Sequence, residues 1–100
     1  MYSLVPTPTF ERDLKRLAKK HWPIANLKRI VELLAEGTNS ELLRTKYADH
    51  ALSSSRAWRG FRELHIDGAN GDWLLIYKIE QKDLILTLVR TGSHKSLLGK

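Results

Sequence analysis

The C-terminal part of the chain contains three segments typical of neighbouring β-strands, and this pattern constrains the fold more than any other feature. Gly60 to Asp67 alternates between apolar and polar side chains, whereas Trp73 to Glu80 and Leu84 to Thr91 are largely apolar on both faces. Turn-forming residues separate the segments at Asp67–Gly71 and Gln81–Asp83. Short turns join antiparallel neighbours, so we expect a meander in which the two apolar segments are central strands.

Two amphipathic helices are predicted ahead of these strands. Thr7 is placed to cap the first helix, with Pro8 at its first position, and Trp22-Pro23 separates it from a second helix that ends at Gly37. Tyr2 to Val5 is a candidate first strand. The apolar positions of the two helices recur at helical spacing: Phe10, Leu14, Leu17, Ala18 and His21, then Ile24, Leu27, Ile30, Val31 and Leu34.

The resulting order is β-α-α-β-β-β, an α+β fold with a twisted antiparallel sheet and an N-terminal helical hairpin packed on one face. Residues 1–100 are expected to form a single domain. Thr38 to Arg59 has weak periodicity and is predicted to be a long connection. The strand alternation places Leu64 and Ile66 on one face and His65 on the other, which we expect to lie partly open.

The composition indicates an anionic partner. The formal net charge is +6 and there is no cysteine, which excludes disulfides and thiol-based metal sites or nucleophiles. No segment is typical of a signal peptide or a membrane span, so we expect a cytoplasmic protein. A basic surface that serves only solubility remains an alternative.

Three of the four histidines lie beside predicted loops and are candidates for acid–base chemistry: His50, His65 and His94. RNA is cut without a metal when its own 2′-hydroxyl attacks the adjacent phosphate. That reaction needs a base, an acid and cations around the phosphate, and His, Asp and Arg suit these tasks. The chain has no H-x-x-H, H-E-x-x-H, G-x-S-x-G or P-loop pattern, so we predict neither a metal site nor a cofactor.

Each of these residues also has an ordinary structural interpretation. His50 and His94 are compatible with plain loop or strand-end positions, and Asp72 with a turn. Trp73 is favoured as a core or sheet-edge residue, although it stays a candidate for contact with RNA. Arginine side chains such as Arg59, Arg62 and Arg90 are compatible with solvated or paired charges.

Four segments taken together resemble the YafQ branch of the RelE-like toxins, from bacterial type II toxin–antitoxin pairs. They are Lys46 to Leu52, Trp58 to His65, Asp72 to Lys78 and Leu88 to His94, and they contain D-H-x-L, W-x-G-F-R-E-x-H, D-W-L-L-I-Y-K and R-T-G-S-H in this order. The resemblance covers nearly the whole chain. It implies a microbial-ribonuclease-like fold and a ribosome-dependent messenger-RNA endonuclease. Such an enzyme would inhibit translation until an acidic antitoxin binds it.

The resemblance also implies roles for individual residues. His94 would be the general acid for the leaving 5′-oxygen, and Asp72 or His65 would activate the 2′-hydroxyl. His50 would hold or neutralise the phosphate. The positions expected to contact phosphate, RNA or ribosomal RNA are Arg59, Arg62, Arg90, Trp73 and Leu98.

Two positions depart from the family pattern. Leu98 stands where members of this branch often carry an aromatic residue, which leaves no π-face for a base. Gly68–Gly71 replaces a shorter, proline-containing link before Asp72 and predicts a less rigid Asp72. Two other functions remain open: a ParE-like toxin that binds DNA gyrase without catalysis, and a basic module that binds RNA or the ribosome.

Overall fold

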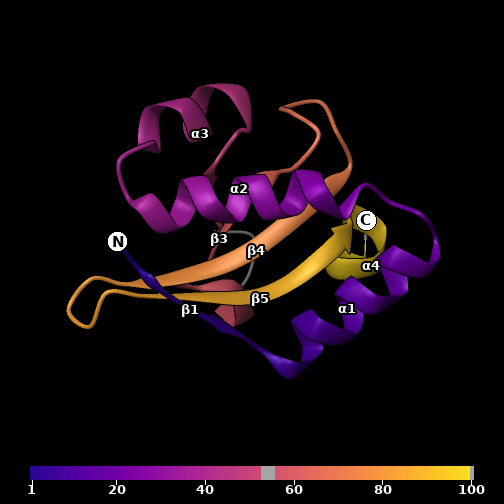
Figure 1. Ribbon diagram of the computed structural model, residues 1–100, viewed down its shortest axis with the longest axis horizontal. Coiled ribbons are helices and arrows are strands. Elements are labelled where there is room, and N and C mark those ends of the chain that lie inside the picture. Colours follow the sequence, from indigo (N-terminus) through magenta and orange to yellow (C-terminus); the bar gives the residue numbers. More distant parts are fainter. Residues whose placement is uncertain (53–55, 100) are drawn as a thin grey trace.

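A computed structural model describes residues 1–52 and 56–99. A five-stranded sheet forms its centre, in the order β1-β5-β4-β3-β2 (Figure 1). The strands are β1 (Ser3–Pro6), β2 (His50–Ala51), β3 (Arg62–His65), β4 (Trp73–Glu80) and β5 (Ile85–Ser93). The C-terminal meander is confirmed, because β3, β4 and β5 pair antiparallel in sequence order.

The expectation of an entirely antiparallel sheet is wrong for one pair of strands. β1 runs parallel to β5, with Ser3 beside Ile85 and Pro6 beside Leu88, so the sheet is mixed. A parallel pair needs a long crossover instead of a tight turn, and the helices together with β2, β3 and β4 supply it. Local sequence patterns carry no information about this pairing, because it joins opposite ends of the chain.

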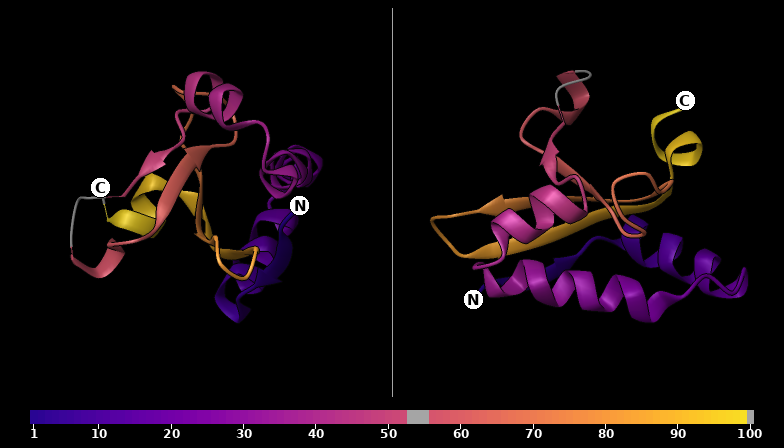
Figure 2. Two further views of the ribbon diagram at one scale, coloured as in Figure 1. Left: turned by 90° about the vertical axis from the view of Figure 1, so that its left-hand side faces the viewer. Right: turned by 90° about the horizontal axis from the view of Figure 1, so that it is seen from above.

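The helical hairpin is confirmed. The first helix, α1 (Pro8–Lys19), begins at the predicted cap, where the Thr7 hydroxyl accepts a hydrogen bond from the Phe10 amide at 3.0 Å. The second helix, α2 (Ile24–Glu36), ends at Gly37, whose φ of 78° is left-handed and therefore suits glycine. Figure 2 shows both helices on one side of the sheet.

The long connection contains more regular structure than expected. A short helix, α3 (Ser40–Lys46), and a 3-10 turn, η1 (Arg56–Trp58), flank β2, while residues 53–55 lie outside the described residues. Leu43 is the one buried residue of α3. A helix with a single buried side chain has no apolar stripe, so periodicity could not reveal it.

The two faces of the sheet carry separate apolar cores. The larger core lies under the helices and includes Phe10, Leu17, Leu27, Ile30, Leu34, Leu64, Trp73, Leu75, Tyr77, Leu86 and Leu88. The smaller core covers part of the opposite face and joins Leu52, Leu74, Ile76 and Leu97. The predicted alternation of β3 is confirmed, because Leu64 lies in the larger core while Phe61 packs on the smaller one.

A final helix, α4 (His94–Leu98), follows β5 directly and lies on the face opposite α1 and α2 (Figure 2). Gly92 permits this close return of the chain. Its φ is 156°, and a Cβ there would lie 2.9 Å from Ser96 Oγ and 3.4 Å from Leu97 Cδ2. No helix within the described residues is both long and apolar enough to cross a membrane.

Candidate active site

The sheet brings two of the predicted histidines together at the end of β5. His65 closes β3 and His94 opens α4, and their ring centroids lie 5.3 Å apart. The strands β3 and β5 flank β4, and α4 follows β5 directly. The two histidines therefore meet although 29 positions separate them in the sequence. Both side chains are partly exposed, which leaves them accessible to a substrate.

Asp72 holds His94 in a defined orientation. One carboxylate oxygen, Oδ1, accepts hydrogen bonds from the His94 backbone amide at 3.1 Å and from His94 Nδ1 at 3.0 Å. These two hydrogen bonds lower the pKa of Asp72 below its ordinary value, so the carboxyl is ionised at neutral pH. The proton on Nδ1 therefore points at Asp72, and Nε2 of His94 is left for chemistry.

His65 is oriented by a backbone carbonyl in the same way. Its Nδ1 lies 2.7 Å from the Gly71 carbonyl oxygen, which can only accept, so Nδ1 carries a hydrogen and Nε2 is left over. The glycine-rich turn that supplies this carbonyl is itself hydrogen-bonded, from the Gly71 amide to Gly68 and from the Ala69 amide to Lys46. The turn therefore orients His65, while the expectation of a less rigid Asp72 stays a prediction.

His50 is linked to this group by Glu63, a residue that the sequence did not single out. Its Nε2 is 3.3 Å from Glu63 Oε1, and its Nδ1 contacts the carbonyl oxygen of Ala48. Both ring nitrogens thus face oxygen atoms that can accept a hydrogen bond. His50 is exposed and pairs with Glu63 across β2 and β3.

Glu63 is the functional candidate that sequence reasoning missed. Its residue is only 5% exposed, and its second oxygen, Oε2, is buried without a hydrogen-bond partner among the described residues. An unsatisfied buried carboxylate oxygen is costly and rare in folded proteins. One signal was available, because Glu63 precedes His65 by two positions in a strand and must share its face.

Three of these side chains form a cluster that has the donor atoms of a metal site. Glu63, His65 and His94 each offer one ligand atom, and the three atoms lie within 4.8 Å of one another. Imidazole nitrogen and carboxylate oxygen suit zinc and copper. The same three side chains are also candidates for proton transfer.

The arginines predicted to bind RNA occupy three different settings. Arg59 is exposed just beyond η1. Arg62 lies beside Tyr77 in the register and shares the helix-covered face, where it contacts the Tyr77 hydroxyl at 3.3 Å and Asp49 at 3.5 Å. The structure therefore does not bring Arg62 to the histidines.

Arg90 is held by a buried carboxylate of α1. Its Nε and Nη2 donate to the two oxygens of Asp13 at 3.1 and 3.0 Å, and its side chain remains partly exposed. The pKa of Asp13 is raised by burial, but the hydrogen bonds from Arg90 and from the Thr91 amide outweigh this and leave the pKa below its ordinary value.

The two apolar candidates for contact with RNA also differ in their settings. Trp73 is 2% exposed, packs edge-on against Trp22 and donates its indole N–H to Thr91 Oγ1 at 2.8 Å. The prediction that Trp73 contacts RNA is therefore wrong, since no face of the ring is available. Leu98 is partly exposed and packs against the smaller core, on the same face as the histidines.

Comparisons with known proteins agree on one family. The model of the protein family described as bacterial toxin of type II toxin–antitoxin system, YafQ, matches residues 2–99. A relative from Escherichia coli strain B, named mRNA interferase toxin YafQ, is 39% identical over 90 residues, which cover 90% of this chain and 88% of the relative.

Solved structures are similar along almost the whole chain. YafQ in the Escherichia coli DinJ–YafQ complex has a TM-score of 0.80 at 35% identity, covering 99% of this chain and 100% of that one. A metal-bound toxin from Helicobacter pylori has a TM-score of 0.82 at 35% identity, covering 97% and 99%. The chain therefore belongs to the YafQ family of toxins of bacterial type II toxin–antitoxin systems.

Proposed function

We propose that this protein is an endoribonuclease that cuts messenger RNA on the ribosome by metal-independent acid–base catalysis. The observation that carries the proposal is the pairing of His65 and His94. Each ring has its Nδ1 tied to a fixed acceptor, and each leaves Nε2 for the substrate. Membership of a family whose relatives are named mRNA interferases supports the nuclease over a gyrase-binding toxin or a passive RNA-binding module.

His94 is assigned the role of general acid. With Nδ1 bonded to the Asp72 carboxylate, the protonated ring can deliver the proton on Nε2 to the leaving 5′-oxygen. Asp72 was also a candidate base, and its Oδ1 accepts hydrogen bonds from both the backbone amide and Nδ1 of His94. Its proposed role is therefore to orient His94 and to stabilise the imidazolium.

The base is assigned to His65 or Glu63, which act on the same side of the sheet. His65 can accept a proton at Nε2, while Glu63 has a buried oxygen, Oε2, with no hydrogen-bond partner in the described part of the chain. His50 is assigned the role of positioning Glu63 through their 3.3 Å contact, in place of the direct phosphate contact that the sequence suggested.

The proposal is tested by mapping cut messages. Wild-type protein and the variants His94→Ala and His65→Ala are added to ribosomes carrying a defined message, and cleavage is followed by primer extension. We expect each substitution to slow cleavage by about a hundred- to ten-thousand-fold. Undiminished cleavage by both variants would rule out the catalytic assignment.

Metal independence is tested separately. Because the candidate metal cluster contains both His65 and His94, a bound zinc or copper ion would compete with the reaction. The purified protein is treated with EDTA, freed of the chelator and then added to magnesium-containing ribosomes; we expect it to cleave at the untreated rate, and cleavage to fall when zinc is added. A requirement for metal after EDTA treatment would overturn this part of the proposal.

Dependence on the ribosome follows from the openness of the site. The histidines lie on a sheet surface with few groups to position a flexible RNA strand, and positioning is a major part of such catalysis. We expect slow cleavage of free message by the purified protein at physiological salt. Equal rates on free and ribosome-bound message would contradict this expectation.

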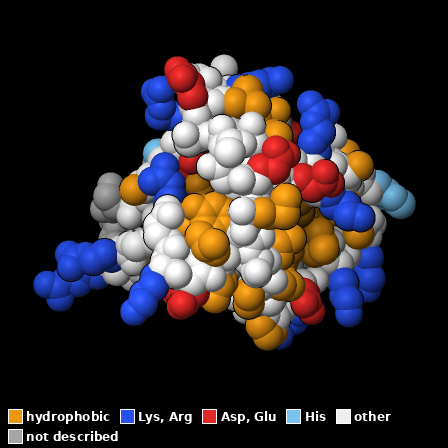
Figure 3. All heavy atoms as spheres, turned by 60° about the vertical axis from the view of Figure 1, so that its left-hand side comes forward, with side chains coloured by type: hydrophobic (Ala, Val, Ile, Leu, Met, Phe, Trp, Pro, Cys, Tyr) orange, Lys and Arg blue, Asp and Glu red, His pale blue; other side chains and the backbone are white. Residues whose placement is uncertain are grey.

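The proposed partner is an acidic antitoxin. The net charge is +6, and Figure 3 shows Lys and Arg side chains around the margin of one face, with apolar side chains nearer its centre. YafQ of Escherichia coli has been solved in complex with DinJ, which supports a protein partner for this chain. Co-expression with a small acidic protein encoded by a neighbouring reading frame, followed by co-purification, tests the pairing; separate elution at physiological salt would contradict it.

A further inference from the structure

The outer edge of β5 loses its strand partner shortly before the active site. β1 ends at Pro6, opposite Leu88, and Thr7 adds two hydrogen bonds, to the carbonyl oxygens of Leu88 and Val89. Beyond that point no described strand pairs with this edge. The remaining residues of β5 lead directly into His94, so the unpaired edge is part of the segment that presents the general acid.

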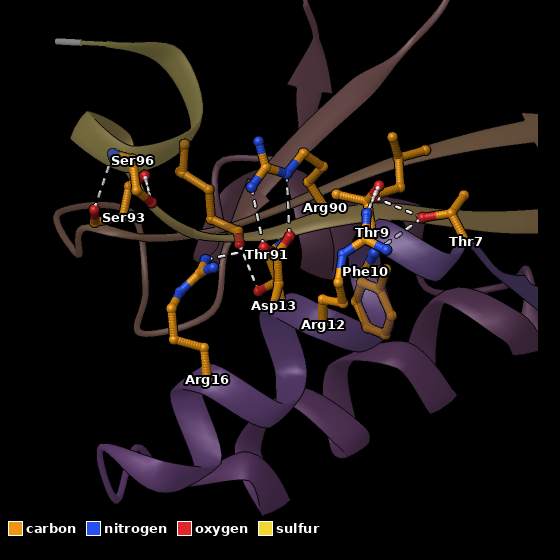
Figure 4. Close-up of polar contacts among 12 residues, drawn as sticks. Thr7, Thr9, Phe10, Arg12, Asp13, Arg16, Arg90, Thr91, Ser93 and Ser96 are labelled. Atoms are coloured by element: carbon orange, nitrogen blue, oxygen red, sulfur yellow. Dashed lines mark hydrogen bonds and ion pairs between the residues drawn. The ribbon is translucent and has the colours of Figure 1, made fainter.

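Asp13 of α1 occupies the place of the missing strand. Its Oδ2 accepts the Thr91 backbone N–H at 3.1 Å, and both of its oxygens accept from Arg90 (Figure 4). The side chain is almost completely buried. One carboxylate thus bonds two successive residues of β5 from a rigid helix.

Thr91 is locked from its other side as well. Its hydroxyl accepts from the indole N–H of Trp73 and donates to the Leu74 carbonyl oxygen, each at 2.8 Å. We call the bonds from Asp13 to Arg90 and to the Thr91 amide the clamp. It ends three residues before His94, and only Gly92 and Ser93 intervene. A shift at Thr91 therefore passes directly into the position of the His94 ring, and a displacement of about 1 Å lowers rates by about a hundred-fold.

We propose that Asp13 is a positioning residue, which sets the location of His94 by clamping Arg90 and the Thr91 amide at the free edge of β5. It acts without touching the substrate. The inference rests on the proposed nuclease site, since it concerns the group assigned as general acid. It adds a requirement on the opposite side of β5, in a helix that contributes no residue to the site.

The test compares Asp13→Asn with Arg16→Ala. Asparagine keeps an oxygen for the Thr91 amide but lacks the charge that holds Arg90. Arg16 donates to the same carboxylate at 2.9 Å but belongs to α1, so its loss leaves β5 attached. Cleavage of ribosome-bound message is measured over a range of substrate concentrations, and the ring resonances of His94 and the exposed His21 are recorded by NMR.

For Asp13→Asn we expect a maximal rate at least tenfold lower, a half-saturating concentration within about threefold of wild type, and shifted ring resonances for His94 but not for His21. Arg16→Ala should match wild type in each measurement. A wild-type rate with unchanged His94 resonances in Asp13→Asn would overturn the proposal, as would equal losses in both variants.

A variant that does not fold is replaced by Asp13→Glu, which keeps the charge on a longer side chain. It should show a smaller loss of rate and smaller His94 shifts, and wild-type values for both would overturn the proposal. Failure of the nuclease assignment is distinguishable, because it appears as full activity of His94→Ala, whereas the NMR measurement reports on the clamp without any substrate.

Discussion

Two buried carboxylates, one on each side of β5, show how differently this protein treats negative charge. Asp13 is 1% exposed and accepts hydrogen bonds from two arginines and a backbone amide. Glu63 is nearly as buried, yet it has one histidine partner at 3.3 Å and an oxygen with no partner among the described residues. Asp13 has the full set of donors expected of a structural charge, whereas Glu63 retains the unused acceptor capacity typical of a reactive one.

The largest expected effect is the loss of cleavage on removing the His94 side chain. His94→Ala should lower the rate of message cleavage by about a hundred- to ten-thousand-fold while changing the free energy of unfolding by less than about 1 kcal/mol. The side chain is exposed enough to leave no cavity. Cleavage rates and urea unfolding measure the two quantities, and a large loss of stability would place His94 among the structural residues.

The next prediction concerns the stability that Asp13 provides. Asp13→Asn leaves Arg90 without its counter-charge, and losing charge-assisted hydrogen bonds of this partly buried kind costs about 1.5 to 3 kcal/mol. A domain of this size has about 5 to 15 kcal/mol in total, so the variant should still fold. Urea unfolding measures the change, with Glu41→Gln as the control, because Glu41 forms an exposed pair with Arg44. Equal losses in both variants would contradict the distinction.

Glu63→Gln should lower the rate of cleavage without lowering stability. The amide has the same shape but cannot act as a base or hold the charge of His50, so we expect cleavage to fall at least about tenfold. Stability should be unchanged or higher by up to about 1 kcal/mol, because an unsatisfied buried charge is removed. Thermal unfolding and cleavage rates decide the matter. A loss of stability as large as that of Asp13→Asn would remove the contrast between the two carboxylates.

The stability that Asp13 provides should also depend on pH. Because the pKa of Asp13 is lower in the folded protein than in the unfolded chain, its contribution is complete above about pH 4 and disappears as pH falls through the folded-state value. Unfolding free energies measured from pH 2 to 6 should therefore decline less steeply in Asp13→Asn than in wild type. Parallel curves would show that Asp13 gains nothing from its partners.

The smallest effect is expected at Arg62. It pairs with Asp49 and Tyr77 on the helix-covered face, so Arg62→Gln should leave message cleavage within about threefold of wild type. Arg59→Gln, a substitution at an exposed position near η1, provides the comparison. If Arg62→Gln instead reduces cleavage more than Arg59→Gln does, RNA must reach the face under the helices.

Much of the fold was accessible from sequence because it depends on local signals. The cap at Thr7, the left-handed stop at Gly37 and the alternation of β3 each follow from residues within a few positions of one another. The short helices α3 and α4 escaped prediction, since neither is long enough to carry a periodic apolar stripe. The parallel pairing of β1 with β5 escaped because its partners lie at opposite ends of the chain.

The site divides in a similar way. Histidines and an aspartate in a recognisable order indicated the chemistry of His50, His65, Asp72 and His94, and the structure gathers all four with Glu63 between them. Trp73 and Arg62 show the limit of that reasoning. Each belongs to a motif that includes a site residue, but successive strand residues face opposite sides of a sheet, and these two face the core.

The sequence by itself determined the two long helices, the C-terminal strands, the chemistry of the candidate side chains and the family, because each depends on residue identity and short spacing. Only the tertiary structure decided which charges have partners. Whether a carboxylate is fully bonded, as Asp13 is, or left with a bare oxygen, as Glu63 is, depends on donors brought from distant strands. The cost of a buried charge is set by that complete environment, and no local pattern of residues contains it.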